Sequence, residues 1–332
     1  MNILENSEWD ALLGNYPNVH VLQSSEWGDF KSRFGWKALK IQDGNSGAQI
    51  LFKKLPLGFS VAYIPKGPVG LITDNLLSAI IKCCKDEKAL VLYLEPDCWE
   101  NVFDSRILLD NGFKESDLSI QPRKTIIISL EGDEQEWLGR MKQKTRYNIN
   151  LAQKKEITVE VSSDIQSFIG LMKLTGKRDA FGIHADRYYK SVYEIFSTKK
   201  SCEILLARYK HTPVAAMMVF FASKRAWYFY GASSNEERNR MPTYLLQWDA
   251  MRLAASRGCE TYDLWGIPDF EEKFLEDNFM SRDDGLWGVY RFKRGFGGEI
   301  KRSAGVFQKV LNPGTYKAYQ TVLRLRKATL AQ

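Results

Sequence analysis

Residues 59–94 read FSVAYIPKGPVGLITDNLLSAIIKCCKDEKALVLYL. The two apolar runs at residues 59–64 and 89–94 have the length and composition of buried strands. Between them, residues 65–68 (PKGP) form a predicted loop, and residues 75–88 form a predicted helix. Strands that alternate with helices predict a mixed sheet covered by helices, which is the α/β (α+β) class.

The same alternation extends along the chain in both directions. Ser24 or Ser25 is the expected N-cap of a helix that carries Lys31 near its end. Further helices are expected at residues 106–111, 165–178, 187–198, 243–257 and 313–332. Further strands are expected at residues 49–55, 125–129, 156–161, 204–209, 214–222, 226–230 and 262–265. Two halves of similar pattern suggest a duplicated α/β unit, although no clear identity relates them.

A second stretch, residues 286–299, reads LWGVYRFKRGFGGE and combines aromatic, basic and glycine residues. We expect a strand here, with Trp287, Val289, Arg291 and Lys293 on one face. Glycines directly afterwards allow a sharp bend or a close approach to a ligand. One interpretation is a half-buried strand whose basic residues are solvated. The other is that Lys293 is held rigidly to meet a negative charge.

Residues 140–155 read RMKQKTRYNINLAQKK and contain six basic residues and no acid. Met141, Ile149 and Leu151 supply an apolar seam, so the segment is predicted to be a basic helix. It is either a solvated helix face or a surface that contacts phosphates.

Composition limits the function only broadly. The chain has 332 residues, a net charge of +7 and a pI of about 9.0, so two domains and an anionic partner are both plausible. Its five cysteines show no CxxC spacing, and its three histidines lie far apart, so we expect reduced thiols, a cytoplasmic protein and no metal site. We expect no secretory signal, because the N-terminal residues carry acids, and no apolar run is long enough to span a membrane.

Several nucleotide and hydrolase motifs are missing. An acyl-CoA transferase of the GNAT type carries Gln/Arg-x-x-Gly-x-Gly/Ala, whose backbone N–H groups bind pyrophosphate. The Arg-x-x-Gly runs that begin at Arg282, Arg294 and Arg302 all fail at the last position. No Walker loop, Rossmann fingerprint or hydrolase elbow is present either.

Six segments together resemble the FemABX family of peptidoglycan bridge aminoacyltransferases. They are QSSEW at residues 23–27 with Lys31, YIPKGP at 63–68, KTRYNI at 144–149, YFYGAS at 228–233, YLLQW at 244–248 and YRFKRGFGG at 290–298. The match runs along nearly the whole chain in the right order, so it is specific as a set. The long coiled-coil arm of some members has no counterpart, so the chain is similar to the armless, FemX-like branch.

This resemblance implies two GNAT-like domains with mixed β-sheets flanked by helices. The first would comprise residues 1–139 together with 306–332, with the C-terminal helix returning to it, and the second residues 140–305. It also implies a channel for the precursor in the cleft between the two domains.

The resemblance further implies functional residues. Lys31 and His184 fall where the phosphates of the precursor are gripped, and Tyr188 and Tyr230 fall where tyrosines line its site. Position 184 is usually arginine in this branch, and a histidine carries little charge near pH 7. Arg178 or Arg187 is therefore an alternative phosphate ligand.

For the reaction itself, Lys293, after Phe292, falls at the lysine linked to catalysis. An ammonium beside the ester carbonyl would stabilise the tetrahedral oxyanion. The sequence offers no convincing protein base. Lys142, Lys144 and Arg146, and the basic C-terminal helix, are the expected contacts to tRNA phosphates.

The expected activity is therefore transfer of an amino acid from aminoacyl-tRNA to the stem peptide of a peptidoglycan precursor. The acceptor would be either soluble UDP-MurNAc-pentapeptide or lipid II, the latter reached by peripheral contact with the membrane. No cofactor is expected. Two alternatives are a GNAT-fold acyltransferase that uses another donor and a non-catalytic RNA-binding protein of the same fold.

Overall fold

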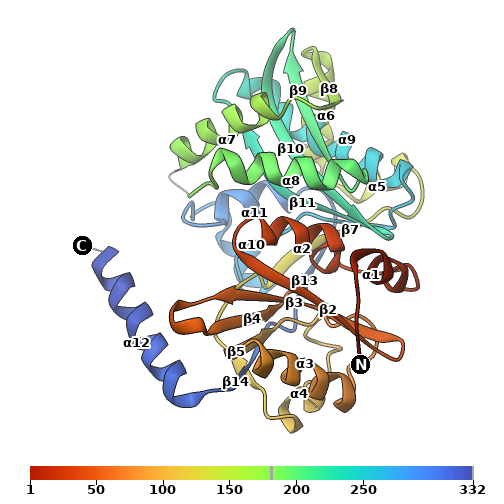
Figure 1. Cartoon of the computed structure of the whole chain (residues 1–332). Coiled ribbons are helices and arrows are strands. Elements are labelled where there is room, and N and C mark those ends of the chain that lie inside the picture. Colours follow the sequence, from red (N-terminus) through yellow and green to blue (C-terminus); the bar gives the residue numbers. More distant parts are fainter. Residues whose placement is uncertain (180–181, 331–332) are drawn as a thin grey trace. The chain divides into compact units, whose positions relative to one another are not determined.

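The computed structural model describes residues 1–179 and 182–330, with side chains described as far as residue 321. The chain divides into two compact units, Met1–Ile120 with Ser303–Gln332 and Gln121–Arg302 (Figure 1). The first boundary lies earlier than residues 139/140, and the second falls at residues 302/303 rather than 305/306. The reason for the first shift is that β7 (Lys124–Ser129) pairs with strands of the second unit.

The first unit is built on a seven-stranded mixed sheet in the order β1-β2-β3-β4-β5-β14-β6. Its strands are β1 (Asn2–Ile3), β2 (Trp36–Asp43), β3 (Ser46–Lys54), β4 (Ser60–Ile64), β5 (Ala89–Leu94), β6 (Lys114–Ser116) and β14 (Val306–Val310). β4 and β5 are the parallel pair, and α3 (Asp74–Asp86) connects them. The strand–helix–strand unit predicted over residues 59–94 is therefore confirmed.

The remaining helices of this unit are α1 (Asn6–Leu13), α2 (Ser25–Ser32), α4 (Arg106–Asp110) and α12 (Pro313–Leu330). Ser24 is the N-cap of α2, because its side chain accepts a hydrogen bond from the Trp27 N–H. α12 returns to the sheet at Tyr316, which packs on Leu90 and Val91 of β5. The side chains of Arg324, Arg326 and Lys327 lie outside the described part of the chain.

The second unit repeats this plan with a seven-stranded mixed sheet in the order β13-β7-β12-β11-β10-β9-β8. Its other strands are β8 (Ile157–Ser162), β9 (Cys202–Tyr209), β10 (Thr212–Ala222), β11 (Arg225–Ser233), β12 (Thr261–Asp263) and β13 (Glu299–Arg302). β11 and β12 are parallel and are connected by α9 (Pro242–Ser256), as β4 and β5 are by α3. This correspondence supports the prediction of a duplicated α/β unit.

The second unit contains further helices, which are α5 (Glu134–Arg140), α6 (Gln143–Lys154), α7 (Ile165–Asp179), α8 (Asp186–Thr198), α10 (Glu272–Asn278) and α11 (Trp287–Lys293). Of these, α6, α7 and α8 pack against the strands of its sheet. The basic helix predicted over residues 140–155 is α6, which begins at Gln143. Arg140 instead ends α5, since the backbone leaves the helical region at Met141 and Lys142.

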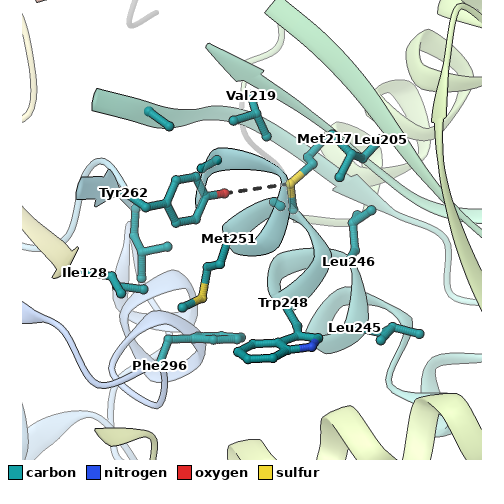
Figure 2. Close-up of a cluster of buried hydrophobic side chains, with 14 of the residues drawn as sticks. Ile128, Leu205, Met217, Val219, Leu245, Leu246, Trp248, Met251, Tyr262 and Phe296 are labelled. Carbon is teal, nitrogen blue, oxygen red and sulfur yellow. Dashed lines mark hydrogen bonds between the residues drawn. The ribbon is translucent and has the colours of Figure 1, made fainter. Parts of the chain in front are cut away.

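Helix α9 carries the core of the second unit (Figure 2). Its buried side chains Leu246, Trp248 and Met251 pack in a cluster with Met217 of β10 and Tyr262 of β12. The Tyr262 hydroxyl donates to the Met217 sulfur at 3.9 Å and accepts from the Gln247 amide at 2.8 Å. The cluster also contains Trp287, Tyr290 and Phe296, so residues 287–296 are anchored in this core.

Candidate active site

Residues 287–293 form helix α11, so the prediction of a strand was wrong. Trp287, Tyr290 and Lys293 are the buried residues of the helix, and they recur every third position rather than every second. Gly285, with φ +52°, precedes the helix, and Gly297, with φ +82°, follows it. The alternation of Trp287, Val289 and Arg291 that indicated a strand is coincidental, because Val289 and Arg291 point away from the core.

Lys293 is enclosed by protein, with only 4% of its surface exposed. Its Nζ donates hydrogen bonds to the carbonyl oxygens of Trp265, at 3.0 Å, and Gly266, at 2.9 Å. Burial lowers the pKa of Lys293 to about 7, and the nearby carboxylate of Asp263 opposes this shift. The interpretation of a solvated lysine is therefore wrong.

The two carbonyls also fix the direction of the remaining N–H bond of the ammonium group. A protonated lysine has three N–H donors, and in the described part of the chain only two of them have acceptors. The third N–H can donate to a further acceptor. With a pKa of about 7, a substantial fraction of Lys293 is charged at neutral pH.

Phe292 lies on the side of α11 that faces α9. Its ring centroid is 5.1 Å from that of Tyr244 on α9 and 5.1 Å from that of Phe296. These contacts anchor the C-terminal end of α11 beside Lys293.

His184, Tyr188 and Tyr230 come together in the second unit, as the resemblance implied. The imidazole of His184 stacks on the Tyr188 ring with centroids 3.8 Å apart, and the Tyr188 and Tyr230 hydroxyls are 3.2 Å apart. Burial raises the pKa of both tyrosines above its ordinary value, so both phenols stay protonated at neutral pH and can donate hydrogen bonds. Lys31 belongs to the first unit.

The Lys31 ammonium lies over aromatic rings at the end of α2, 5.3 Å from the Trp36 centroid and 5.7 Å from that of Trp27. The side chain is half-buried. Burial lowers its pKa, and the charge of Lys53 lowers it further. Two cations held close together in this way favour an anionic ligand, which would relieve their repulsion.

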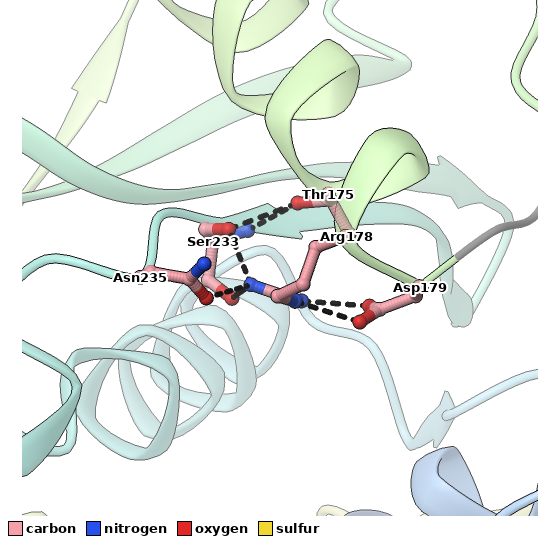
Figure 3. Close-up of polar contacts among 5 residues, drawn as sticks. All are labelled: Thr175, Arg178, Asp179, Ser233 and Asn235. Carbon is pink, nitrogen blue, oxygen red and sulfur yellow. Dashed lines mark hydrogen bonds and ion pairs between the residues drawn. The ribbon is translucent and has the colours of Figure 1, made fainter.

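Arg178 is occupied within the protein, which argues against it as a replacement phosphate ligand (Figure 3). Its guanidinium makes a bidentate ion pair with Asp179, with both distances 2.7 Å, and donates to the Ser233 carbonyl at 2.8 Å. Thr175 and Ser233 exchange two further hydrogen bonds. This network ties the end of α7 to the end of β11, so Arg178 has a structural role, while Arg187 lies exposed at the start of α8.

The three predicted tRNA contacts at residues 142–146 differ in their surroundings. Lys142 and Lys144 are exposed, although Lys142 pairs with Glu276 at 3.2 Å. The Arg146 guanidinium donates to the carbonyl oxygens of Leu138, at 3.2 Å, and Met141. Arg146 therefore caps the end of α5, a role that the sequence did not indicate.

Glu276 on α10 is a residue that the sequence analysis missed. Its carboxylate pairs with Arg294, accepts from the Tyr290 hydroxyl at 2.6 Å and pairs with Lys142. These contacts, that of Arg294 above all, lower the pKa of Glu276 to about 2. The carboxylate thus links α10 to the end of α11 that carries Lys293 and to Lys142 at the start of α6, but its partners are remote in sequence and gave no local signal.

We expect Glu276→Gln to lower the free energy of unfolding by about 1–2 kcal/mol at pH 7, a value discounted because the carboxylate is 36% exposed. A depressed pKa stabilises the fold above the unfolded value of 4.5, and the stabilisation is lost as the pH falls toward about 2. Urea unfolding at pH 7 and pH 3 checks this. The exposed Glu272→Gln on the same helix is the control, and a deficit for Glu276→Gln that persists undiminished at pH 3 would refute the electrostatic explanation.

Among residues 1–179 and 182–330, no group of three His, Cys, Asp or Glu side chains is placed to hold a metal ion. Over the same residues, every helix is too short or too polar to cross a membrane.

Comparison with known proteins decides the family. A model of the FemAB family matches residues 4–111, 109–212 and 202–324, which together span nearly the whole chain. The chain belongs to the FemAB family. The expected family is therefore confirmed, and the chain is an enzyme of the acyltransferase type.

Relatives of known function agree with this assignment. The lipid II:glycine glycyltransferase of Staphylococcus epidermidis is 27% identical over 416 aligned positions, covering 99% of this chain and 97% of that protein. The protein of the same name from Staphylococcus aureus is also 27% identical, covering 98% of this chain. Because the alignment is longer than this chain of 332 residues, these relatives contain insertions that the FemAB protein described here lacks.

Among solved structures, FemX superposes with a TM-score of 0.81 at 25% identity, covering 96% of this chain and 99% of FemX. The C-terminal domain of a lysylphosphatidylglycerol synthetase from Agrobacterium fabrum shares the fold alone, with a TM-score of 0.59 at 14% identity. The predicted fold class, and the similarity to FemX, are confirmed.

Proposed function

We propose that this FemAB protein transfers an aminoacyl group from aminoacyl-tRNA to the stem peptide of a peptidoglycan precursor. The observation that carries the proposal is the buried Lys293, held by two carbonyls with one N–H direction unused. A donor already activated as an ester needs positioning and charge stabilisation more than a strong base. The glycyl transfer to lipid II named for the staphylococcal relatives supports the same class of acceptor.

The reaction forms one bond and breaks one. The amine nitrogen of the stem peptide attacks the ester carbonyl carbon of the donor, and the carbonyl oxygen takes up the negative charge. The third N–H of Lys293 stabilises that oxyanion, an effect worth about 3–4 kcal/mol for one donor in comparable acyl transfers. The C–O bond to the terminal ribose then breaks, and the proton lost by the amine ends on the ribose oxygen. Phe292 keeps the end of α11 in place through its contacts with Tyr244 and Phe296.

We assign binding of the precursor to Lys31, His184, Tyr188 and Tyr230. Burial and the charge of Lys53 lower the pKa of Lys31, so a bound phosphate would stabilise the charged form of its ammonium group. The Tyr188–Tyr230 pair offers phenolic donors, with the His184 ring stacked beside them.

We infer a cytoplasmic location, since aminoacyl-tRNA and a soluble precursor would both be met there. A lipid-linked precursor would add peripheral contact with the membrane. Recovery of the enzyme only from the periplasmic or extracellular fraction of cells would contradict this.

We assign the tRNA contact to Lys142, Lys144 and Arg146. Arg146 also holds this segment through its hydrogen bonds to the carbonyls of Leu138 and Met141.

Lys144→Ala should weaken binding of any tRNA and reduce the slope of log K against log salt concentration by about 0.7–0.9, the value of one lost phosphate contact. Filter binding across a salt series measures this. Lys82→Ala, which removes an exposed lysine from α3, should leave the slope unchanged. Identical slopes for Lys144→Ala and the native protein would remove Lys144 from the interface.

The donor is tested by supplying the enzyme and UDP-MurNAc-pentapeptide with either a mixed pool of charged tRNAs or a set of acyl-CoA thioesters. Incorporation of an amino acid from charged tRNA, abolished when the tRNA is deacylated beforehand, supports the proposal. Incorporation of an acyl group from acyl-CoA alone would show that the enzyme uses a different donor.

A further inference from the structure

A buried carboxylate, Asp263, lies behind the two carbonyls that hold Lys293 and has no role in the mechanism described so far. We propose that Asp263 is the positioning residue of this site. It closes the backbone turn whose carbonyls hold the Lys293 nitrogen, and its negative charge keeps that nitrogen protonated. The inference rests on the proposed function, since it concerns how the same lysine is kept competent.

The turn is a bulge in the chain that follows β12 and pairs with β7. The Leu264 N–H bonds to the Ile126 carbonyl at 2.9 Å and the Ile267 N–H to the Lys124 carbonyl at 3.0 Å, so the chain is paired on both sides of residues 265–266. Trp265 and Gly266, which we call the 265–266 bulge, lie between these two bonds. The bulge directs its two carbonyl oxygens to Lys293.

Asp263 holds the bulge in this shape. Its Oδ1 accepts a hydrogen bond from the Trp265 N–H at 2.7 Å, and it also accepts from the Thr125 hydroxyl. Trp265 has φ +61°, a left-handed conformation that costs a bulky residue free energy and needs such a contact to persist. Only 5% of Asp263 is exposed, so its charge is poorly screened.

The charged and titratable groups around this pair come from strands β11 and β12 and from helix α11. Burial raises the pKa of Asp263 on β12, whereas its hydrogen bonds and the charges of Arg225 on β11 and Lys293 on α11 lower it. Tyr228 on β11 lies under the Lys293 ammonium at 5.5 Å, and Tyr262 on β12 is adjacent. Burial raises the pKa of Tyr228 to about 12 and that of Tyr262 well above its usual value, so neither changes charge near pH 7. β7 contributes the uncharged Thr125.

Asp263→Asn separates charge from shape. Asparagine keeps the side-chain oxygen that accepts from Trp265 and Thr125, so the bulge is retained while the negative charge is lost. An opposite charge within about 4–6 Å shifts a pKa by about one unit or more. The Lys293 pKa should therefore fall, by about one unit on this scale, and the alkaline limb of the transfer rate should move to lower pH by the same amount. At pH 8 the rate should fall about tenfold and recover toward pH 6.

Thr125→Val is the matched control, because it removes a hydrogen bond to Asp263 but keeps both charges. We expect a smaller fall in kcat with the alkaline limb in place. Thermal unfolding of each variant checks that it is folded. A pH profile of Asp263→Asn that coincides with that of the native enzyme would overturn the proposal.

The proposal can also be tested without activity. In protein labelled with ¹⁵N-lysine, the Nζ shift of Lys293 is identified by its absence in Lys293→Met and followed against pH. A midpoint that is lower in Asp263→Asn than in the native protein supports the pairing even if no transfer from tRNA is found. An unchanged midpoint overturns it even if transfer is robust. Failure of this inference and failure of the proposed function are therefore distinguishable.

Discussion

Lys293→Met should lower the rate constant of aminoacyl transfer by about 10²–10³-fold while leaving binding of both substrates nearly unchanged. Methionine has a similar length but cannot donate a hydrogen bond, so the oxyanion loses the one donor that the bulge directs at it. An interaction made only in the transition state appears in kcat and not in substrate affinity. Single-turnover transfer with saturating charged tRNA measures the rate constant directly.

The control for this prediction is Lys273→Met on α10, which replaces an exposed lysine paired with Asp277. It should transfer at the native rate. If Lys293→Met retained more than about a tenth of the native rate constant, one donor of this strength could not be at the reacting oxygen, and the assignment of Lys293 would be wrong.

Gly297→Ala should lower the free energy of unfolding by about 2–4 kcal/mol. The backbone at this position has φ +82°, which any residue with a Cβ adopts at a cost. In addition, the added Cβ would lie 2.4 Å from the carbonyl oxygen and 2.5 Å from the carbonyl carbon of Arg140. Because the obstacle is backbone, no side-chain rotation relieves the overlap. Urea unfolding measures the loss.

Gly288→Ala is the contrasting change on α11. A Cβ there has nothing within 4 Å, and the backbone is helical, so alanine should be neutral or stabilising by up to about 1 kcal/mol. Transfer activity should also fall in Gly297→Ala and not in Gly288→Ala. Gly297 lies two residues beyond Gly295, whose carbonyl accepts the hydrogen bond from the Lys142 N–H that holds this segment. Equal stability of the two variants would show that residues 295–297 do not constrain the helix end.

Much of the fold could be predicted because its signals are local. The run Ala89–Leu94 is a strand with the predicted bounds, and the Ser24 cap follows from a single side-chain hydrogen bond. α9 could be predicted from its apolar residues and from Gly258, which adopts φ +77° just after it. Each of these elements is specified by residues within one or two turns of chain.

Helix α11 could not be predicted in the same way. Its seven residues are few enough for a two-residue and a three-residue repeat to compete. Burial of Trp287 and Tyr290 in the core, with Phe270 stacked on Trp287 at 5.7 Å, decides in favour of the helix. These contacts are tertiary, so a local pattern did not contain them.

The site shows the same division. Resemblance indicated Lys293, His184, Tyr188 and Tyr230, and the last three do come together. The groups that hold and tune Lys293 were not indicated, because the bulge lies 27 and 28 residues away in sequence and Asp263 has no motif of its own. Asp179, the bidentate partner of Arg178, is adjacent in sequence, but the partners Ser233 and Asn235 are more than fifty residues away, so the network that occupies Arg178 could not be predicted.

The proposed aminoacyl transfer is tested most directly by the mass of the acceptor after reaction. UDP-MurNAc-pentapeptide and lipid II are each incubated with the enzyme and a mixed pool of charged tRNAs, and the products are analysed by mass spectrometry. We expect a gain of one or more aminoacyl residues on one of the two precursors, lost in Lys293→Met, and the mass difference names the amino acid. No gain on either precursor from any charged tRNA, with a correctly folded enzyme, would contradict the proposal.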